Sequence, residues 1–179
     1  MTHILLTGGA RSGKSAIAVA LARRDGGDVV FLATGQAGDD EMAGRIARHR
    51  AERPGHWTTI EEPVDLAVAI AAVEGAACLV VDCLSLWVAN RLTAVEAPAI
   101  ELEADGAAGA AASRCATTIV VTNEVGLGVV PATPLGREYR DLLGRVNAIW
   151  AERADEAYLV VAGRLLPLLS AAEVLARGR

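Results

Sequence analysis

The stretch GGARSGKS, residues 8–15, indicates the fold class more strongly than any other part of the chain. It fits the pattern G-x-x-x-x-G-K-[ST], in which the backbone amides of a glycine-rich loop surround phosphate oxygens. An apolar run at residues 3–8 precedes it, and a segment with helical spacing at residues 14–24 follows it. A strand, this loop and a helix in that order predict a phosphate-binding loop; the alternative is a glycine-rich turn that holds no ligand.

Lys14 also stands out in the composition. It is the only lysine, so 16 of the 17 Lys and Arg residues are arginines. A compact ammonium charge at this one position suits a phosphate contact, and we expect it to bridge the β- and γ-phosphates of a nucleoside triphosphate. The Ser15 hydroxyl is expected to ligate Mg²⁺, and Asp82, which ends the apolar run CLVVD, to hold the same ion through water. For Asp82 the alternative is an ordinary aspartate of a turn after a strand.

Apolar runs alternate with segments of helical spacing along the whole chain. The expected strands are residues 3–8, 28–34, 77–83, 116–123 and 156–163, and the expected helices are residues 14–24, 39–53, 64–73 and 135–153. This alternation predicts one α/β domain over residues 1–179, of the P-loop NTPase (RecA-like) type, with a mostly parallel sheet and helices on both faces. Ligands of such sheets bind outside the carboxyl ends of the strands, so we expect the site there.

Two segments carry weaker patterns. Residues 94–115 are rich in alanine, and Pro98, Gly106 and Gly109 interrupt any helix, so a loop followed by a weak helix is expected. A short final helix is expected after Pro167.

Composition and charge exclude several classes of protein. The formal net charge is −5, which argues against a nucleic-acid-binding protein. The N-terminus MTHILLTGG lacks the features of a signal peptide, and no apolar run reaches the roughly 18 residues of a membrane span. Cys78, Cys83 and Cys115 have no metal-ligand spacing, which indicates buried, inert thiols in a reducing compartment. We therefore expect a cytoplasmic protein.

A histidine surrounded by arginines lies in the helix expected at residues 39–53. The segment RIARHRAER, residues 45–53, places four arginines around His49. On helical spacing, His49 lies on the same stripe as Met42, Ile46 and Arg53. We expect these arginines to lower the pKa of His49, which would leave a neutral nucleophile, and to hold a triphosphate. The alternative is a solvated helix face whose cations lie near the negative end of the helix dipole.

The ends of this helix are also marked in the sequence. Asp39 or Asp40 can cap its N-terminus, and Pro54 ends it.

Taken together, the motifs resemble a known family. LLTGGARSGKS, FLATGQAGDDEMAGRIARHRAERPGHW, LVVDCLSLWVANRL, VVTNEVGLGVVP, GREYRDLLGRVN and LVVAG occur in the order and spacing of the bifunctional adenosylcobinamide kinase/adenosylcobinamide-phosphate guanylyltransferase family. The resemblance covers residue 3 to about residue 165, apart from residues 94–115. It implies phosphorylation of adenosylcobinamide by ATP or GTP, and then transfer of GMP from GTP to the phosphate, which forms adenosyl-GDP-cobinamide in vitamin B12 biosynthesis.

The resemblance also implies roles for individual residues. His49 matches the histidine that becomes guanylylated, and Lys14 assists catalysis; Ser15 and Asp82 hold the metal. The implied nucleotide-binding residues are Gly8, Gly9, Ala10, Arg11, Ser12, Gly13, Lys14, Ser15, Ala33, Thr34, Gly35, Arg50, Ala51, Glu52, Arg53, Glu61 and Asp82. The implied partners are GTP, ATP, adenosylcobinamide and its phosphate, and further copies of the chain, because the family forms trimers.

Some parts of the chain fit the resemblance less directly. Asn123 and Glu124 precede two glycines on a loop that suits a mobile wall of the corrinoid site; a glycine-capped turn without a chemical role is the alternative. The family usually ends with a short G.P…K strand, whereas this chain reads GRLLPLLSAAEVLARGR from residue 163. Two other functions are open to the same motifs: a P-loop kinase of a small metabolite without a covalent histidine, and a nucleotide-binding regulatory module without turnover.

Overall fold

A computed structural model describes residues 2–73 and 75–177. The strands are β1 (His3–Gly8), β2 (Val29–Ala33), β3 (Thr58–Glu61), β4 (Cys78–Asp82), β5 (Thr118–Val121), β6 (Glu156–Val161) and β7 (Arg164–Leu168). The helices are α1 (Lys14–Asp25), α2 (Asp40–Ala51), α3 (Leu66–Ala71), α4 (Leu84–Leu92), α5 (Ala97–Ala112), α6 (Pro134–Arg153) and α7 (Ala171–Arg177).

The strands form one sheet with the order β3-β2-β4-β5-β1-β6-β7. All neighbouring strands are parallel except β7, which pairs antiparallel with β6 at one edge. The carboxyl ends of β1, β2, β4 and β5 therefore meet at one edge of the sheet. The predicted strands and helices are confirmed, with ends that differ by a few residues, while β3, β7 and α4 had no counterpart in the sequence-based prediction.

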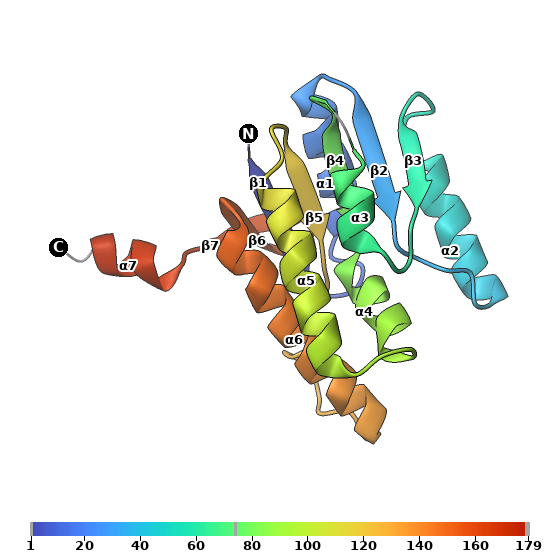
Figure 1. The fold of residues 1–179 in the computed structure, drawn as a ribbon, viewed down its shortest axis with the longest axis vertical. Coiled ribbons are helices and arrows are strands. Elements are labelled where there is room, and N and C mark those ends of the chain that lie inside the picture. Colours follow the sequence, from blue (N-terminus) through green and yellow to red (C-terminus); the bar gives the residue numbers. More distant parts are fainter. Residues whose placement is uncertain (1, 74, 178–179) are drawn as a thin grey trace.

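Helices cover both faces of the sheet, as predicted. Successive residues of β1 point to opposite faces, so Leu5 packs in one core and Ile4 and Leu6 in the other. The Leu5 core lies under α3, α4, α5 and α6, whereas the second core contains Ala18 and Ala22 of α1. Figure 1 shows α5 and α6 running across one face, α2 beyond the β3 edge and α7 extending away from the β7 edge.

The prediction for residues 94–115 is wrong in one respect, because residues 97–112 form one continuous helix, α5. Pro98 lies in its first turn, where the missing N–H would have no helical partner. Gly106 and Gly109 do not interrupt the helix, which packs against both α3 and α6. Burial of the apolar stripe that contains Ile100 and Ala104 stabilises the helix beyond its low intrinsic propensity. The final helix predicted after Pro167 is confirmed as α7, and Pro167 itself lies in β7.

Two glycines of the loop between β1 and α1 are required by the backbone. Gly8 has a φ of +149°, and a Cβ there would lie 2.4 Å from the carbonyl oxygen of Val160 in β6. Gly13 has a φ of +100° and precedes α1 in the left-handed conformation. The loop is also tied to the turn after β6, because the Gly163 amide donates to the Ser12 carbonyl at 2.8 Å.

Candidate active site

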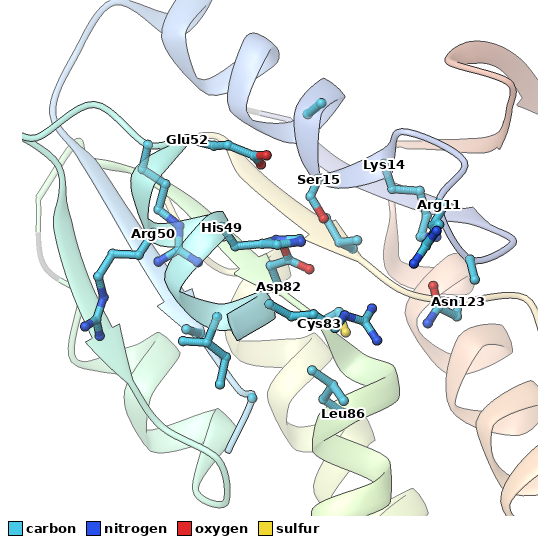
Figure 2. Close-up of a pocket in the computed structure, with 18 of the residues that line it drawn as sticks. Arg11, Lys14, Ser15, His49, Arg50, Glu52, Asp82, Cys83, Leu86 and Asn123 are labelled. Atoms are coloured by element: carbon cyan, nitrogen blue, oxygen red, sulfur yellow. The ribbon is translucent and has the colours of Figure 1, made fainter. Parts of the chain in front are cut away.

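A cavity of about 320 Å³ opens at the carboxyl ends of β1, β2, β4 and β5, between the loop before α1 and the helix α2. Figure 2 shows Ser15, His49 and Asp82 pointing toward its centre, with Lys14 and Arg11 on one side and Arg50 on the other. Its lining residues are Ala10, Arg11, Ser12, Gly13, Lys14, Ser15, Ala16, Ala33, Gly35, Met42, Arg45, Ile46, His49, Arg50, Glu52, Arg53, Glu61, Asp82, Cys83, Leu86, Val121 and Asn123.

Most of the residues predicted for the site line this one cavity. The exceptions are Gly8, Gly9, Thr34 and Ala51. The carbonyl oxygens of Gly8 and Gly9 accept hydrogen bonds from Lys14, and Thr34 is fully buried, where its hydroxyl donates to the carbonyl of Cys83. These three residues therefore support residues that line the cavity without lining it themselves, whereas Ala51 is exposed on α2.

The Lys14 ammonium is held inside its own loop. It donates to the carbonyl oxygens of Gly8 at 3.0 Å and Gly9 at 2.8 Å, and the side chain is buried. Burial lowers the pKa of Lys14 from its ordinary value, and the nearby Cys83 and Asp82 oppose this. The loop thus fixes a cation at the point where a bound nucleotide would place its terminal phosphates.

His49 faces Asp82 across the cavity. Nδ1 of His49 lies 3.8 Å from Oδ2 of Asp82, an ion-pair distance rather than a hydrogen bond. The pKa of His49 is raised from its ordinary value, because the attraction of the protonated ring to the Asp82 carboxylate exceeds the lowering by burial, and the charge of Glu52 adds to it. Arg53 lowers the pKa of His49, but this is the smallest contribution. The expectation that the arginines would lower the pKa of His49 is therefore wrong, because the carboxylate of Asp82, at the end of β4, affects the ring more strongly than the arginines do.

The helix α2 presents one half-buried stripe to the cavity. Asp39 caps it by accepting a hydrogen bond from the Met42 amide at 2.7 Å, and Met42, Ile46 and His49 form the stripe, as predicted. Arg53, predicted on the same stripe, lies in the turn after the helix, which ends at Ala51. The arginines of residues 45–53 separate into two groups. Arg45, Arg50 and Arg53 line the cavity, whereas Arg48 is exposed and does not. The side chains of Arg50 and Glu61 form an ion pair at the rim.

Arg53 is the most enclosed of these arginines. Its guanidinium carbon lies 3.4 Å from the centroid of the Phe31 ring, and its Nε is buried with no hydrogen-bond partner among the residues that the structure describes. Burial lowers the pKa of Arg53, and the charge of Asp82 opposes this. An anion in the cavity would give this cation the charged partner that it lacks.

Ser15 and Asp82 together fit a magnesium ion bound with a nucleotide. Mg²⁺ is typically held by one or two protein oxygens while phosphates and water complete its shell, and this cavity offers a hydroxyl and a carboxylate. The described residues contain no group of three or more His, Cys, Asp or Glu side chains that could hold a metal by themselves. The donor set therefore favours a metal that arrives with its nucleotide over a resident one.

Several lining residues were not among the predicted nucleotide-binding residues. They are Ala16, Met42, Arg45, Ile46, Cys83, Leu86 and Val121. The sequence analysis places Met42 and Ile46 on the helical stripe of His49 without a role in the site, and Arg45 is one of the four arginines expected to hold a triphosphate. Cys83 and Leu86 follow Asp82 into α4, a helix that the sequence-based prediction did not contain. Asn123, which was given no chemical role, also lines the cavity.

The cysteines correct one expectation. Cys78 and Cys83 are buried, and burial raises the pKa of their thiols to about 12 and about 11 respectively. Cys115, however, is exposed. The prediction of buried thiols is therefore wrong for Cys115.

The sequence matches a family of known proteins along most of its length. The family model described as cobinamide kinase / cobinamide phosphate guanyltransferase matches residues 4–168. The bifunctional adenosylcobalamin biosynthesis protein CobP of Pseudomonas aeruginosa is 44% identical over 165 residues, which are 92% of this chain and 95% of that protein. The bifunctional adenosylcobalamin biosynthesis protein CobU of Escherichia coli K12 is 43% identical over 176 residues, with 89% of this chain and 96% of that protein covered.

A solved structure supports the fold at much lower sequence identity. An ATPase of the type III secretion system of pathogenic bacteria matches with a TM-score of 0.51 and 13% identity, over 99% of this chain and 62% of that one. In the part of the chain that the structure describes, no helix is both long and apolar enough to cross a membrane. The family model and the relatives together place the sequence: the chain belongs to the cobinamide kinase / cobinamide phosphate guanyltransferase family.

Proposed function

We propose that the protein phosphorylates adenosylcobinamide with ATP or GTP and then transfers GMP from GTP to adenosylcobinamide phosphate through a guanylylated His49. The products of the second reaction are adenosyl-GDP-cobinamide and pyrophosphate. One observation carries this proposal beyond family membership. His49, facing Asp82, lines the same cavity as the phosphate-binding loop with Lys14.

The position of Asp82 supports Nε2 as the reacting nitrogen of His49. Nδ1 faces the Asp82 carboxylate, so Nε2 is the nitrogen available to a nucleotide. In the first displacement, the Nε2 lone pair forms a bond to the α-phosphorus of GTP, and the bond from that phosphorus to the bridging oxygen breaks as pyrophosphate leaves. The ring then carries positive charge, and the Asp82 carboxylate stabilises it in the manner of an orienting aspartate.

The second displacement returns the ring to its first state. A phosphate oxygen of adenosylcobinamide phosphate attacks the α-phosphorus, and the P–N bond breaks with its electron pair returning to Nε2. Lys14 lies where it stabilises the negative charge that develops on the departing pyrophosphate in the first step. Arg53, without a partner for its buried Nε, is placed to hold the nucleotide between the two steps.

The kinase reaction uses the same loop. The cavity positions a triphosphate by Lys14 and the loop amides, and positioning with electrostatic stabilisation supplies most of the catalysis in phosphoryl transfer. Ser15 and Asp82 would hold Mg²⁺, which supplies charge neutralisation to the phosphates when it is bound.

We also propose that the protein acts in the cytoplasm as a homo-oligomer, a trimer as in the family it resembles, with its β7 edge in contact with another copy. Four leucines of this edge are exposed: Leu165, Leu166, Leu168 and Leu169. Val174 and Leu175 of the following helix α7 are exposed as well. An edge strand with apolar side chains favours pairing with another chain.

Labelled GTP tests the covalent step directly. The protein incubated with GTP labelled at the α-phosphate is expected to retain label that is stable to alkali and released by acid, as for a phosphoramidate. His49→Ala should lose this label, and the matched control His56→Ala, an exposed histidine outside the cavity, should keep it. The label should then transfer to adenosylcobinamide phosphate.

Two outcomes would contradict the proposal. Phosphoryl transfer to a substrate without any label on the protein would indicate a P-loop kinase without a covalent histidine. Nucleotide binding with neither label nor transfer would indicate a regulatory module.

A further inference from the structure

Asn123 lies two residues after the end of β5, at the centre of the nucleotide-binding edge. In the sheet order, β5 stands between β4, which ends in Asp82, and β1, which ends in Gly8 at the start of the phosphate-binding loop. Asn123 is half-buried and lines the cavity together with Lys14 and Asp82. The topology alone therefore places a carboxamide between the loop that holds the phosphates and the carboxylate proposed to hold the metal.

The backbone around Asn123 is tied to the phosphate-binding loop. The amide of Glu124 donates to the carbonyl of Gly8 at 3.0 Å, and the same carbonyl accepts a hydrogen bond from Lys14 at 3.0 Å. The carbonyl of Asn123 accepts from Nδ2 of Asn147 at 3.0 Å. Oδ1 of Asn147 in turn accepts from the Thr122 hydroxyl at 2.7 Å. These hydrogen bonds fix the position of Asn123 relative to Lys14, the residue expected to contact the terminal phosphates of the nucleotide.

The side chain of Asn123 is held by one end only. Its Nδ2 donates to Oγ of Ser85 at 3.1 Å, and Ser85 also contacts the buried Cys83 thiol. Within the described residues, Oδ1 of Asn123 has no hydrogen-bond partner, although the residue lines the cavity. Figure 2 shows Asn123 on the Lys14 and Arg11 side of the cavity, away from Arg50. An oriented acceptor oxygen therefore faces the end of the site where a γ-phosphate would lie.

We infer that Oδ1 of Asn123 accepts a hydrogen bond from the substrate hydroxyl that attacks the γ-phosphorus, and so aims that oxygen in the kinase reaction. This inference rests on the proposed function and adds a residue to it. The hydroxyl oxygen forms the new bond to the γ-phosphorus, and the bond to the β–γ bridging oxygen breaks with its electron pair leaving on the nucleoside diphosphate. A carboxamide is not a base at neutral pH, so the hydroxyl proton passes to solvent or to a phosphoryl oxygen.

The role assigned to Asn123 separates the two reactions of the site. The attack of His49 on the α-phosphorus needs no incoming hydroxyl, so guanylylation of His49 does not use Oδ1 of Asn123. Loss of the carboxamide should therefore affect the kinase reaction selectively. A residue that only supported the fold or bound nucleotide would affect both reactions together.

The test measures both reactions on the same preparations of the full chain. Asn123→Ala is expected to lower kcat for phosphorylation of adenosylcobinamide by roughly 10- to 100-fold, as loss of an orienting contact does, with less than about threefold change in KM for ATP. Acid-labile label from α-labelled GTP should stay within about twofold of the unaltered protein. Asn123→Asp keeps an acceptor oxygen and should recover part of kcat, with a raised KM for ATP because its charge repels the triphosphate.

Glu138→Gln is the control. Glu138 is exposed on α6 and lies outside the cavity lining. Both reactions of this variant should stay within about twofold.

Three results would overturn the inference: a kcat of Asn123→Ala within twofold of the unaltered protein, an equal fall of both reactions, or a change confined to KM for ATP. If the unaltered protein neither phosphorylates adenosylcobinamide nor takes up label, the proposed function itself fails. That result differs from an active protein that is indifferent to Asn123.

Discussion

The Arg53 guanidinium carbon lies over the ring of Phe31, 3.4 Å from the ring centroid. Phe31 is the only phenylalanine of the chain and is almost fully buried in β2. The ring provides a fixed apolar support that attracts a cation. It therefore orders the long Arg53 side chain before a nucleotide binds, which reduces the entropy that binding would otherwise cost.

Arg53→Lys should weaken nucleotide binding although the charge is kept. Lysine cannot stack on Phe31 or present a planar fork to phosphate, so we expect KM for GTP to rise about 5- to 30-fold, with kcat changed less. Initial rates of pyrophosphate release at varied GTP concentration measure this. Arg48→Lys, on the exposed side of α2, is the control and should change KM by less than about twofold. Equal effects of the two variants would show that only the helix charge matters.

Arg114 connects β5 with the segment between α3 and β4, at the end of the sheet opposite to the candidate site. Its guanidinium donates to the carbonyls of Val73 at 2.6 Å and Ala77 at 2.7 Å and to the Thr118 hydroxyl at 3.2 Å. Arg114→Ala would leave these partly buried acceptors without a partner, so the free energy of unfolding should fall by about 2–4 kcal/mol.

Chemical denaturation of both proteins measures this loss. Arg164→Ala, at an exposed arginine, should change the free energy of unfolding by less than about 0.5 kcal/mol. A similar small change for Arg114→Ala would mean that water replaces the guanidinium at little cost.

His3 makes stability depend on pH. Burial lowers the pKa of His3, while its hydrogen bond to the Arg153 carbonyl and the charge of Asp155 oppose this. Since the folded protein binds the proton less readily than the unfolded chain, stability is greatest above the ordinary pKa of about 6.5 and falls as the pH decreases below it.

Replacement of His3 should remove this contribution. The free energy of unfolding, compared between pH 7.5 and pH 5.5, should decrease more for the unaltered protein than for His3→Gln, which cannot be protonated in this range. An equal decrease in both proteins would assign the pH dependence to other groups.

The exposed leucines of β7 predict the oligomeric state. Leu166→Lys should reduce association by placing a charge in the proposed contact, so that the mass in solution falls toward that of one 18.5 kDa chain. Sedimentation velocity gives this mass. Leu102→Lys on α5, equally apolar and more exposed, is the control and should leave the mass unchanged. A single-chain mass for the unaltered protein would contradict the proposed contact.

The parts of the fold that sequence predicted best depend on local signals. The run before Gly8, the glycine-rich loop and the lysine lie within a few residues of one another, and so does the stripe from Met42 to His49. The continuous helix α5 was missed because its stability comes from packing against α3 and α6, which a single segment does not reveal.

The electrostatics of His49 could not be predicted for the same reason. The four arginines are its neighbours in sequence, but Asp82 lies 33 positions away and reaches the ring only because β4 and β2 are adjacent in the sheet. Likewise, helical spacing separates Arg53 from Arg48, but nothing in the sequence shows that Arg53 lies over the ring of Phe31, which comes from β2.

The hydrogen bond from the Gly163 amide to the Ser12 carbonyl connects the β6–β7 hairpin, at the edge of the sheet, to the phosphate-binding loop. Gly163 belongs to the turn that connects β6 with β7. A contact that holds the β7 edge in place would therefore also hold the phosphate-binding loop in place. A neighbouring subunit docked there would need no side chain of its own in the catalytic chamber to influence turnover.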